Sequence, residues 1–187
     1  MKENIHMFDL MDTLVWSPNL MKLFATENAE LLARFKQDPK KYQRETATVA
    51  DSYLADGRVE LQVYADTVAN LQRLRQQSKI AVLSNGKENT ITRILDKTGL
   101  TSLVNEAFSL DQFEGRDKSE AELYRLVTQR LEGSGLYVAS YTDDKDKYCL
   151  AAADSRIIPS VFQIVRTAEL PQPKGNYKVI RSLEEVR

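Results

Sequence analysis

The chain of 187 residues is poor in the side chains on which many enzyme classes depend. Its only cysteine is Cys149, which excludes an internal disulfide and fits a reducing, cytoplasmic setting. Its only histidine is His6, so a Ser-His-Asp triad, a Cys-His pair or a multi-histidine zinc site would have to be built around one residue. His6 stands within an apolar run near the N-terminus, where a structural role is favoured over a catalytic one.

Long apolar runs and an excess of one charge are also missing. No apolar run approaches the about 20 residues that cross a bilayer, and the N-terminus lacks the pattern of a secretory signal. We therefore expect a soluble protein with no membrane partner. The 26 basic and 27 acidic residues leave a net charge of -1, which provides no field for capturing nucleic acid. A small-molecule substrate held by local contacts is the expected partner.

Short apolar runs that end in polar residues recur along the chain. The strand-like runs cover residues 5–8, 80–83, 136–141, 161–165 and 179–180. Amphipathic helical patterns cover residues 68–74, 91–95 and 120–131, the last with Ser119 and Glu122 at the spacing of a capping box. This alternation predicts an α/β fold, a Rossmann-like three-layer sandwich with a mostly parallel sheet. The polar strand ends, among them Asp9, Ser84 and Asp143, would then converge at one edge of that sheet.

Residues 17–56 interrupt this alternation. They contain no convincing strand, but they include two helical stretches, 20–36 and 39–54, that are rich in alanine, glutamate, lysine and arginine. Proline and glycine mark the two ends of the interruption, at Pro18 and Gly57. We therefore expect an α/β core formed by residues 1–16 and 57–187, with a small inserted helical cap formed by residues 17–56.

The segment of residues 9–14, Asp-Leu-Met-Asp-Thr-Leu, resembles the first motif of the haloacid dehalogenase superfamily, Asp-x-Asp-Gly-Thr-Leu. The resemblance implies that Asp9 is the covalent nucleophile, which attacks phosphorus or carbon. In the family an aspartate two residues later is the general acid, and this chain has Met11 there, so the motif is degenerate. Asp12 is then the candidate acid and base, or the reaction needs no such acid, or turnover is slow.

Two further segments resemble the second and third motifs of the same family. Ser84, followed by Asn85, resembles the second motif, which holds the transferred group; Thr13 of the first motif would help to orient that group. Lys118, in the segment Lys-Ser-Glu-Ala-Glu-Leu-Tyr, resembles the third motif, although both of the usual prolines are replaced. The resemblance implies that Lys118 offsets the negative charge of the nucleophile and of the phosphate oxygens.

Asp143 and Asp144 occupy the place of the fourth motif, which holds magnesium through hard oxygen ligands. The resemblance therefore implies a Mg²⁺ site formed by Asp9, the backbone carbonyl of Met11, Asp143 and Asp144, with Asp146 nearby. Read without the resemblance, the aspartates of this segment form a solvated loop that caps the following helix. Both interpretations stay open from the residues alone.

The resemblance extends from residue 5 to about residue 183 and combines traits of two kinds of enzyme. Residues 63–166 look like enolase-phosphatases, whereas the Leu-Ser-Asn-Gly segment ending at Gly86 looks like haloacid dehalogenases. The leading hypothesis is a magnesium-dependent phosphatase that acts on a small phosphorylated metabolite through an aspartyl-phosphate intermediate. One alternative is a binding or regulatory module that has lost turnover, as Met11 suggests. Another is a metal-independent haloacid dehalogenase. Those enzymes carry an arginine shortly after the first motif, whereas the first arginine of this chain is Arg34.

Overall fold

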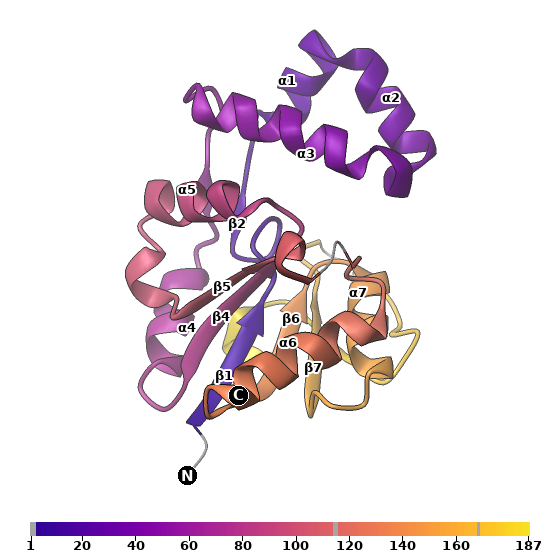
Figure 1. Cartoon of the computed structure of the whole chain (residues 1–187). Helices are drawn as coiled ribbons and strands as arrows, with labels where there is room; N and C mark the ends of the chain where they lie inside the picture. The colour runs from indigo at the N-terminus through magenta and orange to yellow at the C-terminus, as the bar shows by residue number, and fades with distance from the viewer. Residues whose placement is uncertain (1–2, 114–115, 168) are drawn as a thin grey trace. The chain divides into compact units, whose positions relative to one another are not determined.

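The computed structural model describes residues 3–113, 116–167 and 169–187. The chain folds as two compact units, one formed by Met1–Val15 together with Val63–Arg187 and the other by Trp16–Gln62. The first unit is an α/β domain, and the second consists mainly of helices (Figure 1).

The α/β unit is built on a six-stranded sheet in the order β5-β4-β1-β6-β7-β8. The strands are β1 (Glu3–Phe8), β4 (Lys79–Ser84), β5 (Glu106–Ser109), β6 (Leu136–Asp143), β7 (Ser160–Ile164) and β8 (Lys178–Ile180). All neighbouring pairs run parallel. The second halves of β1 and β4 are buried without interruption, as expected for strands covered on both faces. The predicted α/β class with a parallel sheet is confirmed.

Helices cover both faces of this sheet (Figure 1). They are α4 (Thr67–Leu74), α5 (Glu88–Thr98), α6 (Ala121–Gly133) and α7 (Asp146–Asp154), with short 3₁₀ turns η1 (Thr101–Leu103), η2 (Leu110–Phe113) and η3 (Leu183–Glu185). Helices α6 and α7 contact each other and share one apolar core with Ile5 and Met7 of β1. Because side chains alternate along a strand, residue 9 faces the same side as these two residues.

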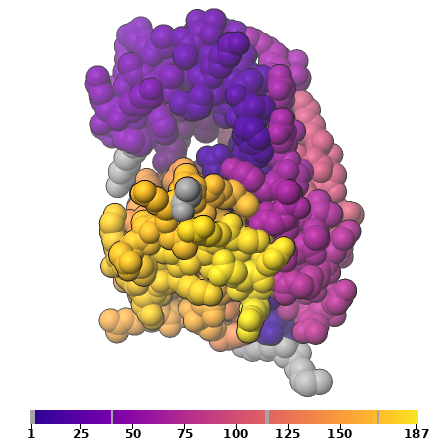
Figure 2. Space-filling model, turned by 180° about the vertical axis from the view of Figure 1, so that it is seen from behind, coloured from indigo at the N-terminus to yellow at the C-terminus, as the bar shows by residue number. Residues whose placement is uncertain are grey.

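The C-terminal segment fastens onto α4, which lies far from it in the sequence. Figure 2 shows this segment in yellow beside the magenta surface of the α4 region, and η3 contacts α4. The Arg73 guanidinium donates to the carbonyl oxygen of Val186 at 2.8 Å. At the start of α4, the Asp66 carboxylate accepts from the backbone N–H of Leu183 at 2.8 Å rather than from the helix itself. Two polar contacts thus tie the end of the chain to the core.

The helical unit contains α1 (Leu20–Glu27), α2 (Ala29–Gln37) and α3 (Pro39–Ala55). Phe24 and Tyr53 form its centre, with their rings in an edge-to-face arrangement at 5.5 Å between centroids. The Asp38 carboxylate accepts from the backbone N–H of Lys41 at 3.1 Å and caps α3, whose first residue is Pro39. Two short paired strands, β2 (Val15–Trp16) and β3 (Gln62–Val63), lead into and out of this unit. In the described part of the chain, no helix has the length and apolar character needed to cross a membrane.

The unit boundaries differ by a few residues from the predicted insertion of residues 17–56. Residues 57–62 belong to the helical unit because Arg58 forms an ion pair with Glu27, and its carbonyl oxygen accepts from Asn19 at 2.9 Å. The role of this unit as a cap stays a prediction.

The predicted capping box at Ser119 and Glu122 is wrong. Helix α6 begins at Ala121, and its N-cap residue, Glu120, makes no side-chain cap. One turn earlier, the Asp117 carboxylate accepts from the backbone N–H of Ser119 at 2.8 Å, and the Glu120 carboxylate accepts from that of Asp117 at 3.1 Å. These two bonds close a tight turn around residue 118, and this turn directs the lysine there toward the sheet.

Candidate active site

Asp9 lies directly after β1, at the carboxyl edge of the sheet, with β4 on one side and β6 on the other. Its backbone N–H donates to the carbonyl oxygen of Thr142 at 2.8 Å, which continues the pairing of β1 with β6 for one more residue. Its side chain is only 10% exposed. The central position of β1 therefore places a buried carboxylate where two neighbouring strand ends can reach it.

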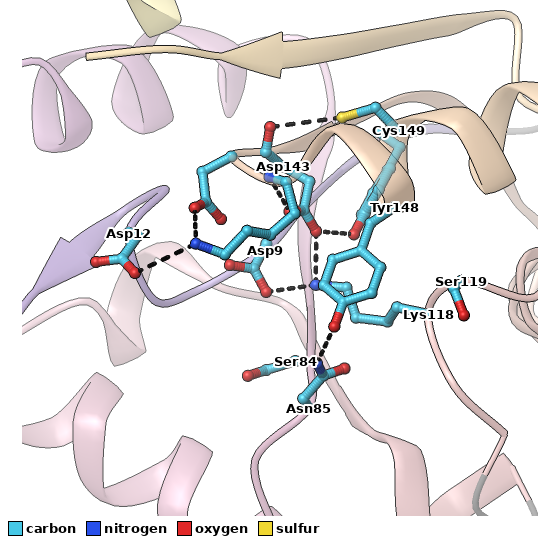
Figure 3. Close-up of polar contacts among 12 residues, drawn as sticks. Asp9, Asp12, Ser84, Asn85, Lys118, Ser119, Asp143, Tyr148 and Cys149 are labelled. Atoms are coloured by element: carbon cyan, nitrogen blue, oxygen red, sulfur yellow. Dashed lines mark hydrogen bonds and ion pairs between the residues drawn. The ribbon is translucent and has the colours of Figure 1, made fainter. Parts of the chain in front are cut away.

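Lys118 is the cation that compensates this carboxylate (Figure 3). Its Nζ lies 2.5 Å from Asp9 Oδ1 and 2.6 Å from Asp143 Oδ2, and its side chain is 1% exposed. The same ammonium lies 4.8 Å from the ring centroid of Tyr148. Because Lys118 holds Oδ1 of Asp9, Oδ2 is the oxygen through which Asp9 can react with a ligand.

Asp143, the last residue of β6, is fully buried and accepts several hydrogen bonds. Its Oδ1 accepts from the backbone N–H of Lys145 at 2.8 Å, and its Oδ2 accepts from the Tyr141 hydroxyl and from Lys118. A carboxylate held by that many donors has a fixed orientation. Asp143 therefore does not lie in a solvated loop.

Lys145 contacts two further carboxylates of the site, those of Asp144 and Asp12. Lys145 Nζ lies 2.5 Å from Asp144 Oδ2 and 3.8 Å from Asp12 Oδ2. Asp12 has a φ of 64°, in the left-handed region that glycine adopts most easily, and its side chain is 56% exposed. The structure thus brings Asp144 next to Asp143, whereas Asp12 is turned toward Lys145 and solvent.

Ser84 is the last residue of β4, the neighbour of β1 on the side away from β6, and Asn85 follows it. The Ser84 hydroxyl accepts from the backbone N–H of Gly86 at 3.3 Å, and the Asn85 amide donates to the Tyr148 hydroxyl at 2.9 Å. Asn85 Oδ1 is buried and has no hydrogen-bond partner in the described part of the chain. An unpaired buried acceptor is costly, so a ligand that supplies a donor would be favoured at this position.

Thr13 and Met11 complete the loop that follows Asp9. Thr13 is fully buried; its hydroxyl has no hydrogen-bond partner among the residues that the structure describes, whereas its carbonyl oxygen accepts from the Arg166 guanidinium at 2.9 Å. Arg166 also forms an ion pair with Asp66 at 3.0 Å and stacks on the ring of Tyr64. Met11 is partly exposed, and its backbone forms an isolated bridge with Val15 within the same loop.

Burial is the strongest influence on ionisation in this site. It raises the pKa of Asp9 to about 8; the charge of Lys118 opposes this rise, and the charges of Asp143 and Asp144 add to it. Burial and the charge of Asp143 also raise the pKa of Asp144 to about 6. Burial alone would lower the pKa of Lys118, but the charges of Asp143 and Asp9 raise it overall, so this lysine stays cationic at neutral pH.

The donor set fits a divalent cation. Asp9, Asp143 and Asp144 each offer a carboxylate oxygen, and these oxygens lie within 4.8 Å of one another. Together with Asp12 they bring four carboxyl groups to a place with two lysine ammonium groups, which leaves an excess of negative charge that is larger when Asp9 is ionised. Hard oxygen ligands with this excess charge suit Mg²⁺.

The family of the chain follows from a direct comparison. Residues 6–140, more than half of the chain, match the family model of haloacid dehalogenase-like hydrolases, and the matched stretch includes Asp9, Ser84 and Lys118. The chain belongs to the haloacid dehalogenase-like hydrolase family. The family predicted from the four motifs is confirmed.

Solved structures share the fold of this haloacid dehalogenase-like chain over nearly its whole length. A HAD phosphatase from Thermococcus onnurineus is 18% identical, with a TM-score of 0.71 over 100% of this chain and 96% of that chain. A dehalogenase is 16% identical, with a TM-score of 0.68 over 98% of this chain and 95% of that chain. A HAD family hydrolase from Deinococcus radiodurans R1, with bound phosphate and sodium, is 18% identical, with a TM-score of 0.67 over 100% and 94%. No curated protein sequence matches the chain. The shared fold thus covers both phosphatases and dehalogenases.

Four residues around the site of this haloacid dehalogenase-like protein were not predicted from its sequence. They are Tyr141, Lys145, Tyr148 and Arg166. Strand alternation could have indicated Tyr141, which stands two residues before Asp143 and faces the same side. Lys145 and Tyr148 follow the fourth motif closely in the sequence. For Arg166 no local signal exists, because 153 residues separate it from the Thr13 carbonyl that it contacts.

Proposed function

We propose that this haloacid dehalogenase-like hydrolase is a magnesium-dependent phosphatase that acts on a small phosphorylated metabolite. The proposal is carried by the 2.5 Å contact between Asp9 and buried Lys118, beside the carboxylates of Asp143 and Asp144. A carboxylate fixed in this way has one oxygen available for nucleophilic attack.

In the proposed reaction, Asp9 Oδ2 attacks the phosphorus atom of a phosphate ester. The bond from Asp9 to phosphorus forms while the ester P–O bond breaks, and the departing alcohol oxygen takes a proton. Water then attacks the aspartyl-phosphate, which releases inorganic phosphate and regenerates Asp9. Lys118 offsets the charge of Asp9 and of the phosphoryl oxygens throughout.

The phosphoryl group would be oriented by polar side chains whose hydrogen-bonding groups are still available to a ligand. The Thr13 hydroxyl has no partner among the described residues and can donate to a phosphoryl oxygen, with Ser84 donating from the end of the adjacent strand β4. Asn85 Oδ1 can only accept, so it would bind a hydroxyl or amine of the substrate rather than the phosphoryl oxygens. Magnesium, held by Asp9, Asp143, Asp144 and the Met11 carbonyl, would supply positive charge against the same phosphoryl oxygens.

The leaving group needs a proton donor, and the residue that supplies it in the family motif is replaced here by Met11. Met11 cannot carry a proton, so we assign the acid and base role to Asp12, the neighbouring residue in the loop. Asp12 is exposed and lies 3.8 Å from Lys145, so it has to rotate toward the leaving group in each turnover. Slow turnover is the expected consequence.

The experiment is release of phosphate from an aryl phosphate in the presence of Mg²⁺. Asp9→Asn should lower the rate by about 10³-fold or more, because the nucleophile is lost. Asp154→Asn, which removes an exposed carboxylate at the end of α7, is the matched control and should leave the rate unchanged. Equal rates for wild type and Asp9→Asn would refute the proposal, as would binding of Mg²⁺ and a phosphate mimic without any turnover.

The second candidate is displacement of halide from a small haloacid, and Met11 is the observation that favours it. A halide leaves as an anion and needs no proton donor, so methionine at this position costs that reaction nothing. Asp9 would attack carbon, with Lys118 as its only required counter-charge. This candidate predicts halide release that persists in the presence of a chelator, whereas the phosphatase predicts loss of all activity there.

A further inference from the structure

Lys145 is a second cation at the acidic cluster, and it differs from Lys118 in its exposure to solvent. It immediately precedes α7, and its Nζ lies 2.5 Å from Asp144 Oδ2 and 3.8 Å from Asp12 Oδ2. Its side chain is 53% exposed, whereas that of Lys118 is 1% exposed. Lys118 is therefore enclosed in the site, and Lys145 can move into solvent.

The contacts of Lys145 separate a main-chain role from a side-chain role. Its backbone N–H donates to Asp143 Oδ1 at 2.8 Å and orients that carboxylate. Its ammonium group touches a different carboxylate, that of Asp144, one of the three that offer oxygens to a cation. A side-chain substitution keeps the first contact and removes the second, so the two roles can be tested apart.

We propose that the Lys145 ammonium is an internal competitor for the divalent cation, so that metal binding requires Lys145 to leave Asp144. The inference rests on the metal site of the proposed function. A cation bound at the Asp144 carboxylate would lie within a few ångströms of the ammonium, and the two positive charges repel. The Lys145 side chain is 53% exposed, so its ammonium can withdraw into solvent and the competition is reversible.

This competition gives the site two stable states. Without a metal, Lys145 neutralises Asp144 and part of the charge of Asp12, which reduces the repulsion among the clustered carboxylates. With a metal, the ammonium is released toward solvent. The affinity for Mg²⁺ is thus lower than it would be if the three carboxylates had no competing cation. It depends on Lys145, which is not itself a metal ligand.

The test is binding of the metal alone, without substrate, measured by calorimetry with Mg²⁺ and by electron paramagnetic resonance with Mn²⁺. Lys145→Met should bind either ion about 10-fold more tightly than wild type, because one unit of opposing charge is gone. Lys145→Arg keeps the charge and should show wild-type affinity. Lys174→Met is the matched control, since Lys174 forms an exposed ion pair with Asp146 at 2.8 Å outside the three-carboxylate set, and it should not change the affinity.

Several outcomes would overturn the inference. Unchanged or weaker metal binding by Lys145→Met would show that Lys145 positions Asp144 or is a bystander, and a gain in Lys174→Met of equal size would show a general charge effect. Absence of metal binding in all variants also overturns it. Because no substrate is used, these results are independent of phosphate release: an inactive protein can still show the shift, and an active phosphatase can fail to show it.

Discussion

Removal of the buried ammonium at Lys118 should destabilise the fold in a way that depends strongly on pH. Lys118→Met preserves much of the side-chain volume but leaves Asp9 and Asp143 buried without their shared counter-charge. Removing one partner of a buried ion pair costs about 3–5 kcal/mol, against a total stability of about 5–15 kcal/mol for a typical domain. With the middle of each range, about 4 of about 10 kcal/mol, the variant should fold and lose about two fifths of its stability at pH 8.

The pH dependence follows from the direction of the pKa shift. Burial already raises the pKa of Asp9 to about 8, and loss of Lys118 removes the main opposing influence. A carboxyl whose pKa is raised in the folded state stabilises the fold at acid pH, and that stability is lost as the pH rises through the folded pKa. The difference between Lys118→Met and wild type should thus be smaller at pH 5.5 than at pH 8.

The assay is urea unfolding followed by circular dichroism at these two pH values. Lys118→Met combined with Asp143→Asn serves as the internal control, because removal of one uncompensated carboxylate should recover part of the lost stability. A loss below about 1 kcal/mol at pH 8, or a loss that is the same at both pH values, would refute the idea that Lys118 compensates buried charge.

Three further predictions concern the chemistry of the site. Met11→Asp should raise kcat for an aryl phosphate by about 10²-fold or more, because it supplies the missing general acid; a steady-state assay that shows no gain would count against the phosphatase. Thr13→Val should lower kcat/KM by about 10²-fold while changing the unfolding free energy by less than about 1 kcal/mol, since none of the described residues bonds to the hydroxyl. Parallel losses of activity and stability would contradict this. The affinity for Mg²⁺ should rise between about pH 6 and about pH 8, because protons on Asp144 and Asp9 compete with the cation there. Calorimetry in two buffers of different ionisation enthalpy should show proton release on binding, and a pH-independent affinity would contradict the prediction.

Hydrophobic patterning was sufficient to predict the class of fold. The runs that became β1, β4 and β6 are short, apolar and followed by polar residues, which is typical of buried parallel strands. Strand β5 (Glu106–Ser109) was missed because its four residues form neither an apolar run nor an alternating pattern. Its strand conformation depends on pairing with β4, a contact that local sequence does not encode.

The capping box predicted at Ser119 and Glu122 failed for a related reason. The spacing was right, but α6 begins two residues after Ser119, because Asp117 and Glu120 close the preceding turn. That turn is the one from which Lys118 reaches the carboxylates. The helix start therefore departs from the capping-box pattern at the place where the chain has to position Lys118 in the site.

The sequence by itself determined which chemical groups stand at the ends of the strands: a carboxylate at Asp9, a hydroxyl at Ser84 and a carboxylate pair at Asp143 and Asp144. Only the tertiary structure decided which cations neutralise the charges of these carboxylates. Lys118 contacts Asp9, which lies 109 residues earlier in the chain, and Asp143, while Lys145 contacts Asp144 and the exposed Asp12. Charge compensation depends on distance and burial, and both arise from strand order and helix packing rather than from neighbours in the sequence.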